Sequence, residues 1–469
     1  MTRELPALLV AACSTALLVS GCKSKEKAPP EMERGRTAAE RTTAGPSASS
    51  APVAVAQGRV LAELATSPDG SDGAPPPAAG GEFLFAKRGG AVAWIAGSGA
   101  ESRVVHNGRP GPGYRSIGLL ALSSDGRRLA YSALGADGKW RVVVDGVERG
   151  PFAMTGPLGF SPDGAHVAYT VKDGAGWHHV VDGVQARAAG PWLFFEFAAN
   201  APHIAYVEAP EGELAGDLVL ADLSLERRTV VERHVMALMV NGDGTRIAAV
   251  GQRQGRLRIV SLPFDRPGDV TREREYDDIT GFDYVLQRTV TAYLAERDRT
   301  RFLVLGQHEV PAPKEAIAGY PVPTGDEKGV GAFVSANEGA VLFREFFVDG
   351  AGPEAPYDDA ESLVYAAAGR AHAYAARKND RWFVVANGRA GPAYDRVVTP
   401  AFSPDGKYLV YRVRRDGKRF VVVADASGKV IREHAAYEQV FPVQFTADGR
   451  SVAYGVKDGR MLAWKVEPL

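Results

Sequence analysis

The residue with the clearest chemical role in this sequence is Cys22, because its thiol follows a short apolar run near the N-terminus. Residues 5–19 form that run. It is shorter than the roughly 20 residues of a membrane span, but it has the length of the apolar part of a signal peptide. The small residues Ser20 and Gly21 precede the cysteine. Cleavage between Gly21 and Cys22 would leave a thiol at the new N-terminus, where it can be acylated.

The run Leu18-Val19-Ser20-Gly21-Cys22 resembles the lipobox of bacterial lipoproteins at every position. The resemblance implies a signal peptide over residues 1–21, and a Cys22 that carries a thioether-linked diacylglycerol and usually an N-acyl chain. We therefore expect an exported protein of the cell envelope that is bound to the membrane through Cys22. The outer membrane is favoured over the inner one, because Lys23 is not the Asp of a known retention signal. The alternatives are cleavage before Cys13 and an uncleaved anchor helix.

Residues 22–80 are rich in Ala, Pro, Ser, Thr and Gly and contain few large apolar side chains. Such a segment cannot offset the entropy of ordering its backbone. We predict a disordered linker here. One more apolar stretch, residues 53–64, could instead dock on the body as a strand or a short helix.

The rest of the chain lacks the usual signatures of enzymes and metal sites. Both cysteines lie in the first 22 residues, and the pair His178-His179 is expected to point to opposite faces of a strand, where it could not chelate one metal. We find no Gly-x-Ser-x-Gly elbow, phosphate-binding loop or dinucleotide fingerprint, and no hydrolase domain after residue 469. We therefore predict no catalytic residue, no cofactor and no metal.

The composition is that of an ordinary globular protein, with 45% hydrophobic residues and a formal net charge of -1. A balanced charge gives no electrostatic reason to expect a nucleic-acid partner.

An internal repeat organises residues 81–469. Its clearest copies read Ser-Pro-Asp-Gly and then a small residue and Tyr a few positions later, as in Ser161 to Tyr169 and Ser403 to Tyr411. Copies centred on Asp125, Asp448 and weaker positions bring the total to about ten, at steps of about 40 residues. Within one copy, Val-rich runs bounded by Asp-Gly turns predict short strands, and we assign a type I′ turn to Asp405-Gly406.

This pattern resembles the TolB-like, WD-repeat-like propeller repeat. The resemblance implies an all-β fold, a β-propeller of four-stranded blades over residues 81–469, with about ten repeat units and a blade count of 7–10. The last unit has room for only three strands, so a strand from residues 53–64 could complete it.

An aromatic residue recurs at a fixed position in six of the units, ahead of the Asp-Gly turn. These residues are Tyr114, Phe152, Tyr276, Tyr357, Tyr394 and Tyr437, and in four of the six an acidic residue follows. Packing between neighbouring blades explains such rings. The alternative is an aromatic rim on one face that binds a partner.

From these features we expect a lipid-anchored, non-catalytic propeller that binds a protein partner in the envelope or acts as a scaffold. Two alternatives are a small-molecule sensor or enzyme that uses the central channel, and a passive structural lipoprotein. The channel is expected to be lined by small or apolar residues of the inner strands, such as Ala121, Leu158, Ala401 and Val443.

Overall fold

The computed structural model describes residues 58–66, 72–78, 81–98, 101–283, 289–336, 339–348 and 353–469. These residues form 39 strands and no α-helix. The predicted signal peptide, Cys22 and the linker up to residue 57 lie outside this described part. Among the described residues, no helix is long and apolar enough to cross a membrane.

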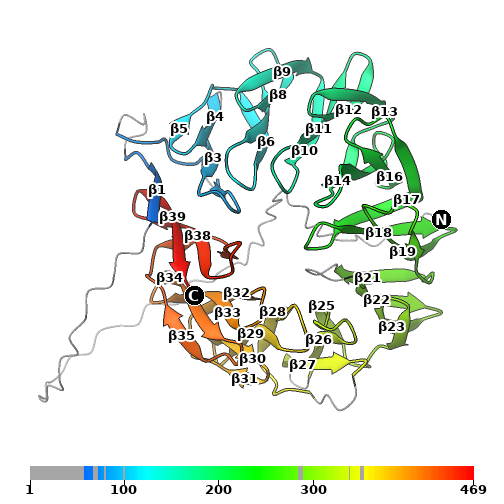
Figure 1. Ribbon diagram of the computed structural model, residues 1–469, viewed down its shortest axis with the longest axis vertical. Coiled ribbons are helices and arrows are strands. Elements are labelled where there is room, and N and C mark those ends of the chain that lie inside the picture. The colour runs from blue at the N-terminus through cyan, green and yellow to red at the C-terminus, as the bar shows by residue number, and fades with distance from the viewer. Residues whose placement is uncertain are drawn as a thin grey trace, which may run out of the picture.

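The strands form antiparallel sheets that follow one another around a common centre, as Figure 1 shows, and the fold is a β-propeller. We number the sheet units 1 to 10 along the chain. Units 1 to 3 contain β2 (Leu84–Phe85), β3 (Val92–Ser98), β4 (Glu101–His106), β5 (Arg109–Pro110), β6 (Ser116–Leu122), β7 (Leu129–Leu134), β8 (Trp140–Val144), β9 (Val147–Phe152), β10 (Met154–Phe160), β11 (Val167–Asp173), β12 (Gly176–Val181) and β13 (Val184–Ala188).

Units 4 and 5 form one continuous sheet of seven strands. They contain β14 (Trp192–Phe197), β15 (His203–Glu208), β16 (Gly216–Asp222), β17 (Arg228–Val240), β18 (Arg246–Arg253), β19 (Arg256–Pro263) and β20 (Thr271–Arg272). The 13-residue strand β17 pairs with β16 through its first half and with β18 through its second half. It is therefore the outer strand of unit 4 and the inner strand of unit 5.

Units 6 to 9 return to separate sheets, and unit 7 has three strands among the described residues. These units contain β21 (Asp278–Asp283), β22 (Ala292–Arg297), β23 (Thr300–Leu305), β24 (His308–Pro311), β25 (Ile317–Pro323), β26 (Val330–Ser335), β27 (Val341–Phe346), β28 (Asp359–Tyr365), β29 (His372–Lys378), β30 (Arg381–Ala386), β31 (Arg389–Ala390), β32 (Arg396–Phe402), β33 (Tyr408–Arg415), β34 (Lys418–Asp425) and β35 (Val430–Glu433).

Unit 10 joins the two ends of the described chain. It contains β36 (Gln439–Val440), β37 (Gln444–Phe445), β38 (Ser451–Asp458), β39 (Met461–Pro468) and, paired with β39, the first strand β1 (Gly58–Glu63). Leu61 and Leu64 are buried in a core cluster with Trp94 of unit 1 and Trp464 of unit 10. The described body therefore includes β1, ahead of the predicted boundary at residue 81, because this short apolar stretch gains a ladder and a core by pairing with β39.

The turn between the first two strands of a unit differs from our prediction. Gly406 has a positive φ of 71°, but Asp405 does not, so the turn is not of type I′. Instead, the Ser403 hydroxyl contacts the Asp405 carboxylate at 2.6 Å and accepts a hydrogen bond from the Tyr408 amide at 2.9 Å. These side-chain bonds favour a conformation in which glycine alone needs the left-handed region.

Type I′ geometry occurs at other turns of the repeat. Both residues of Asp145-Gly146 have positive φ, at 51° and 81°, and Asp416-Gly417 is similar. The Asp145 side chain also accepts a hydrogen bond from the Leu129 amide, at the start of the second strand of its unit. The Asp-Gly signature thus fixes the register of three strands at once.

Candidate functional site

The six recurring aromatic residues lie between neighbouring sheets. Each pairs with the third strand of one unit, as in the bridge between Ser102 and Tyr114 or the pair of Trp140 and Phe152. The exposed fractions of the five tyrosines are 9% or less, and Phe152 is partly buried. These rings therefore stabilise the contact between sheets and leave little surface for a partner.

Four of these five tyrosines contact the tyrosine of the repeat on the second strand of the next unit. Tyr276 and Tyr293 have ring centroids 6.0 Å apart at an interplanar angle of 81°. The pair Tyr394 and Tyr411 repeats this edge-on contact at 6.3 Å. The recurring geometry is favourable for aromatic quadrupoles. It makes the tyrosine pair a structural element of the repeat.

Acidic side chains complete several of these pairs. The Tyr276 hydroxyl donates to Glu309 at 2.7 Å, and the Tyr293 hydroxyl donates to Glu273 at 2.8 Å. Tyr374 likewise donates to Glu354 at 2.7 Å. Buried hydroxyls need such partners, because an unmet donor costs free energy.

Unit 5 departs from this pattern. Glu232 of β17 pairs with Leu218 of the third strand of unit 4. It lies 17 residues before Ala249, the spacing that separates Tyr114 from Tyr131. On the second strand of unit 5, Ala249 replaces the tyrosine of the repeat. Among the described units, unit 5 is the one whose second strand carries no aromatic residue. Both rings of the usual pair are therefore missing here.

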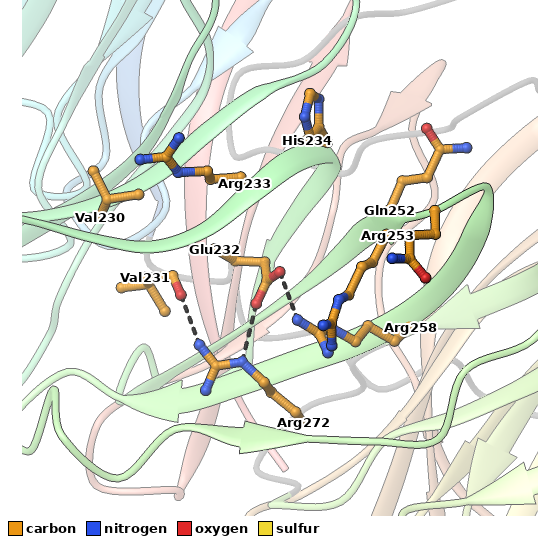
Figure 2. A pocket seen from close by; sticks show the side chains of 10 residues that line it. Val230, Val231, Glu232, Arg233, His234, Gln252, Arg253, Arg258 and Arg272 are labelled. Atoms are coloured by element: carbon orange, nitrogen blue, oxygen red, sulfur yellow. Dashed lines mark hydrogen bonds and ion pairs between the residues drawn. The ribbon is translucent and has the colours of Figure 1, made fainter.

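A cavity of about 390 Å³ lies at this position. Figure 2 shows it between the bend of β17 and the hairpin that joins β18 to β19. The residues that line it are Val230, Val231, Glu232, Arg233, His234, Gln252, Arg253, Gln254, Arg258 and Arg272. We call this cavity the arginine pocket, because four of its lining side chains are guanidinium groups.

The Glu232 carboxylate lies at the base of the arginine pocket between two guanidinium groups (Figure 2). Its Oε1 accepts from Arg258 Nη2 at 2.8 Å and its Oε2 from Arg272 Nε at 3.1 Å. The side chains of Glu232 and Arg258 are 9% and 13% exposed, so this pair is largely desolvated. A Cβ at Gly251 would lie 3.0 Å from Glu232 Cγ, so glycine leaves the room that Glu232 occupies.

The arginine pocket keeps hydrogen-bond donors that the protein does not use. Arg258 Nε is buried and has no hydrogen-bond partner among the described residues. The carboxylate nearest to Arg253 is that of Glu275, and the two groups lie 4.0 Å apart. Arg233 and His234 are paired with neither β16 nor β18 in the register, and His234 has a φ of 51°. The bend in β17 thus turns polar groups towards solvent at the edge of the pocket.

A second cavity of about 790 Å³ lies between units 5, 6 and 7. Its most unusual side chain is Glu273, which is buried and accepts hydrogen bonds from Thr291 at 2.5 Å and Tyr293 at 2.8 Å. Burial raises the pKa of Glu273 to about 7, against the opposing effect of these two bonds. Burial likewise raises the pKa of Glu196, on the inner strand of unit 4, to about 7.

The predicted histidine pair is part of the packing. His179 is fully buried, its ring lies 4.7 Å from that of Trp192, and its Nε2 lies 3.2 Å from the Gly190 carbonyl oxygen. Burial lowers its pKa to about 3. Within the described part of the chain, no three His, Cys, Asp or Glu side chains are grouped closely enough to hold a metal ion.

The arginine pocket was not predicted from the sequence. The available signal was a break in the repeat: Glu232 stands where six units have an aromatic residue, and Ala249 stands where the repeat has tyrosine. A unit that breaks the residue pattern of its own repeat without an evident gain in stability is typical of a functional site. The four arginines themselves come from four different strands, β17 to β20, and only the folded sheet brings them together.

The likeness of this chain to known proteins is distant in both sequence and structure. The sequence matches no protein-family profile and no curated protein. Among solved structures, TolB from Acinetobacter baumannii is 14% identical, with 58% of this chain and 78% of that chain covered and a TM-score of 0.29. The tricorn protease is 14% identical over 78% of this chain and 42% of that one, with a TM-score of 0.28. An oligogalacturonate lyase in complex with manganese is 12% identical over 74% and 88%, with a TM-score of 0.31.

Proposed function

We propose that this chain is a lipid-anchored β-propeller of the cell envelope that binds a partner protein without catalysing a reaction. The observation that carries the proposal is the arginine pocket, where the chain replaces an apolar contact of its own repeat with charged groups and an open cavity. An open pocket packs less densely than the aromatic contact that it replaces. Such a loss of packing is expected where the surface serves recognition. Anchoring rests on the lipobox-like run that ends at Cys22.

Site-directed photo-cross-linking in cells tests this proposal. A photoreactive residue is placed at Gln254, an exposed residue that lines the arginine pocket, in the full-length chain. The matched control carries the same residue at Val184, which is 48% exposed on an outer strand away from the pocket. We expect a discrete cross-linked protein from position 254 and none from position 184. The same products from both positions, or none from either, would contradict recognition at this pocket.

The anchor is tested separately. Mass spectrometry of the mature N-terminus should show a Cys22 that carries acyl chains, and a Cys22→Ser variant should leave the membrane fraction. An unmodified cysteine in the membrane-bound protein would overturn the lipoprotein assignment.

A further inference from the structure

We propose that the arginine pocket binds a carboxylate group of an acidic peptide segment, an inference that rests on the proposed function and names the chemistry of the partner. The starting point is the charge of the pocket. Four arginine side chains line it, whereas Glu232 is its one acidic lining residue, and the next carboxylate, Glu275, lies beside Arg258 at 3.5 Å. The pocket is therefore positive even after these two acids are counted.

The free donors of the pocket suit a carboxylate. A guanidinium group binds a carboxylate through two parallel hydrogen bonds, and such charge-assisted bonds are among the stronger ones in proteins. Glu232 uses Nη2 of Arg258 and Nε of Arg272, and the Val231 carbonyl uses Nη2 of Arg272. The buried Nε of Arg258 has no hydrogen-bond partner among the described residues, and the ion pair of Arg253 with Glu275 is long, at 4.0 Å, so an incoming carboxylate can take donors of both side chains.

The rest of the lining favours a peptide over a small inorganic anion. Gln252 and Gln254 each offer an amide that can donate to and accept from a peptide backbone. Val230, which is 49% exposed, supplies an apolar contact at the edge for a neighbouring side chain.

The position in the fold supports the same occupant. The bend of β17 leaves Arg233 and His234 outside both ladders, so the backbone at the edge of the pocket is not committed to the sheet. Extended peptides are commonly held by such backbone groups, with specificity set by side-chain pockets. A short acidic segment of a partner can therefore align along the bend and place one carboxylate among the arginines.

The binding experiment uses the purified full-length protein and a fluorescein-labelled hexaglutamate peptide as the probe. Anisotropy should show saturable binding that weakens as salt rises. Arg253→Gln is the test variant, because this side chain is 62% exposed and its loss spares the core. We expect its affinity for the peptide to fall about tenfold, the loss of one charge-assisted pair.

Arg256→Gln is the matched control. Arg256 lies on the same hairpin and pairs with Asp277 at 3.3 Å, but it does not line the pocket. Its substitution should leave the affinity for hexaglutamate within about twofold of the unaltered protein. Equal losses in the two variants, or no saturable binding, would overturn the inference.

Competition identifies the source of the anion. Unlabelled hexaglutamine should not displace the probe, and neither inorganic phosphate nor vesicles containing phosphatidylglycerol should displace it better than free glutamate peptide does. Stronger displacement by phosphate or by the vesicles would contradict the commitment to a peptide. If position 254 cross-links a partner in cells but hexaglutamate does not bind, the proposed function stands and this inference fails.

Discussion

Glu232 pairs with Leu218 across the ladder between β17 and β16, and it lies 17 residues ahead of Ala249, the spacing that separates Tyr114 from Tyr131 in the unit 1–2 contact. One repeat position therefore holds a buried aromatic ring in some units and a buried carboxylate in another. The ring needs little more than packing. The carboxylate requires Arg258 and Arg272 to neutralise it, and this requirement is what draws guanidinium groups to one place in the molecule.

Substitution Glu232→Gln should lower the free energy of unfolding by about 2–4 kcal/mol, because it removes the buried carboxylate that pairs with the largely buried Arg258 and leaves only the longer contact with Glu275, at 3.5 Å. Urea unfolding followed by tryptophan fluorescence measures the change. Glu361→Gln is the control, since Glu361 pairs with Arg396 at 2.6 Å but is 38% exposed, and it should cost less than about 1 kcal/mol. Similar losses in both variants would show that the Glu232 pair is not desolvated as described.

The pH dependence of stability should carry an unusual contribution from Glu273. Burial raises its pKa in the folded state to about 7 from 4.5, so the folded protein holds this proton to higher pH than the unfolded chain does. Stability from this group is therefore present below pH 4.5 and is lost as the pH rises to about 7.

Comparison with Glu273→Gln isolates that contribution. From pH 5 to pH 8, the stability of the unaltered protein should fall relative to this variant by about 2–3 kcal/mol. Thermal unfolding across this range provides the measurement. The exposed Glu213→Gln variant should keep a constant difference from the unaltered protein. A constant difference for Glu273→Gln as well would mean that Glu273 is ionised throughout.

The tyrosine pair is expected to stabilise the interface between units 5 and 6. Tyr276→Ala removes a ring that is 1% exposed and should cost about 3–5 kcal/mol, as for other large core truncations. Tyr276→Phe keeps the ring and loses the bond to Glu309, at a cost of about 0.5–1.5 kcal/mol. Chemical unfolding distinguishes the two. Equal costs would show that the hydroxyl, and not the ring, dominates.

The pairing of β1 with β39 predicts a sharp limit for N-terminal truncation. Removal of residues 1–57 should leave the melting temperature unchanged, because the ladder with β39 begins at Gly58. Removal of residues 1–65 exposes the edge of β39 and loses the buried side chains of Leu61 and Leu64, at about 1.5–3 kcal/mol each. The longer truncation should melt earlier and aggregate, as size-exclusion chromatography would reveal. Identical behaviour of the two truncations would contradict this role of β1.

The repeat could be predicted from the sequence because its turns are local. Asp-Gly pairs and Val-rich runs act over a few residues, so the strands predicted around Tyr408 and Phe420 are confirmed. The prediction for residues 53–64 is a linker, with a docked strand or helix as alternatives, and the structure has a strand over Gly58–Glu63. The type of turn at Asp405 was wrong, because the competing hydroxyl of Ser403 is a specific side-chain effect. The single strand shared by units 4 and 5 was not foreseen, since nothing in its 13 residues marks where one sheet ends and the next begins.

The arginine pocket could not be predicted, for a different reason. Nothing in the sequence distinguishes Arg258 and Arg272 from the other arginines. Their contacts with Glu232 join residues that lie 26 and 40 positions apart in the chain. The recurring aromatic residues show the same limit, because the sequence reveals their positions but not their role. Their periodicity was visible, but only the register shows that the rings point between sheets.

The ladder between β1 and β39 has a mechanical consequence. Gly58 lies opposite Lys465 and Glu63 lies opposite Met461, so tension on the chain ahead of Gly58 acts along the strand and across its hydrogen bonds. All the bonds of the ladder then share the load and would have to break together, as in a lap joint, instead of opening one at a time like a zipper. A pull from the N-terminal side is thus resisted by the C-terminal strand, and the two ends of the chain secure each other against force.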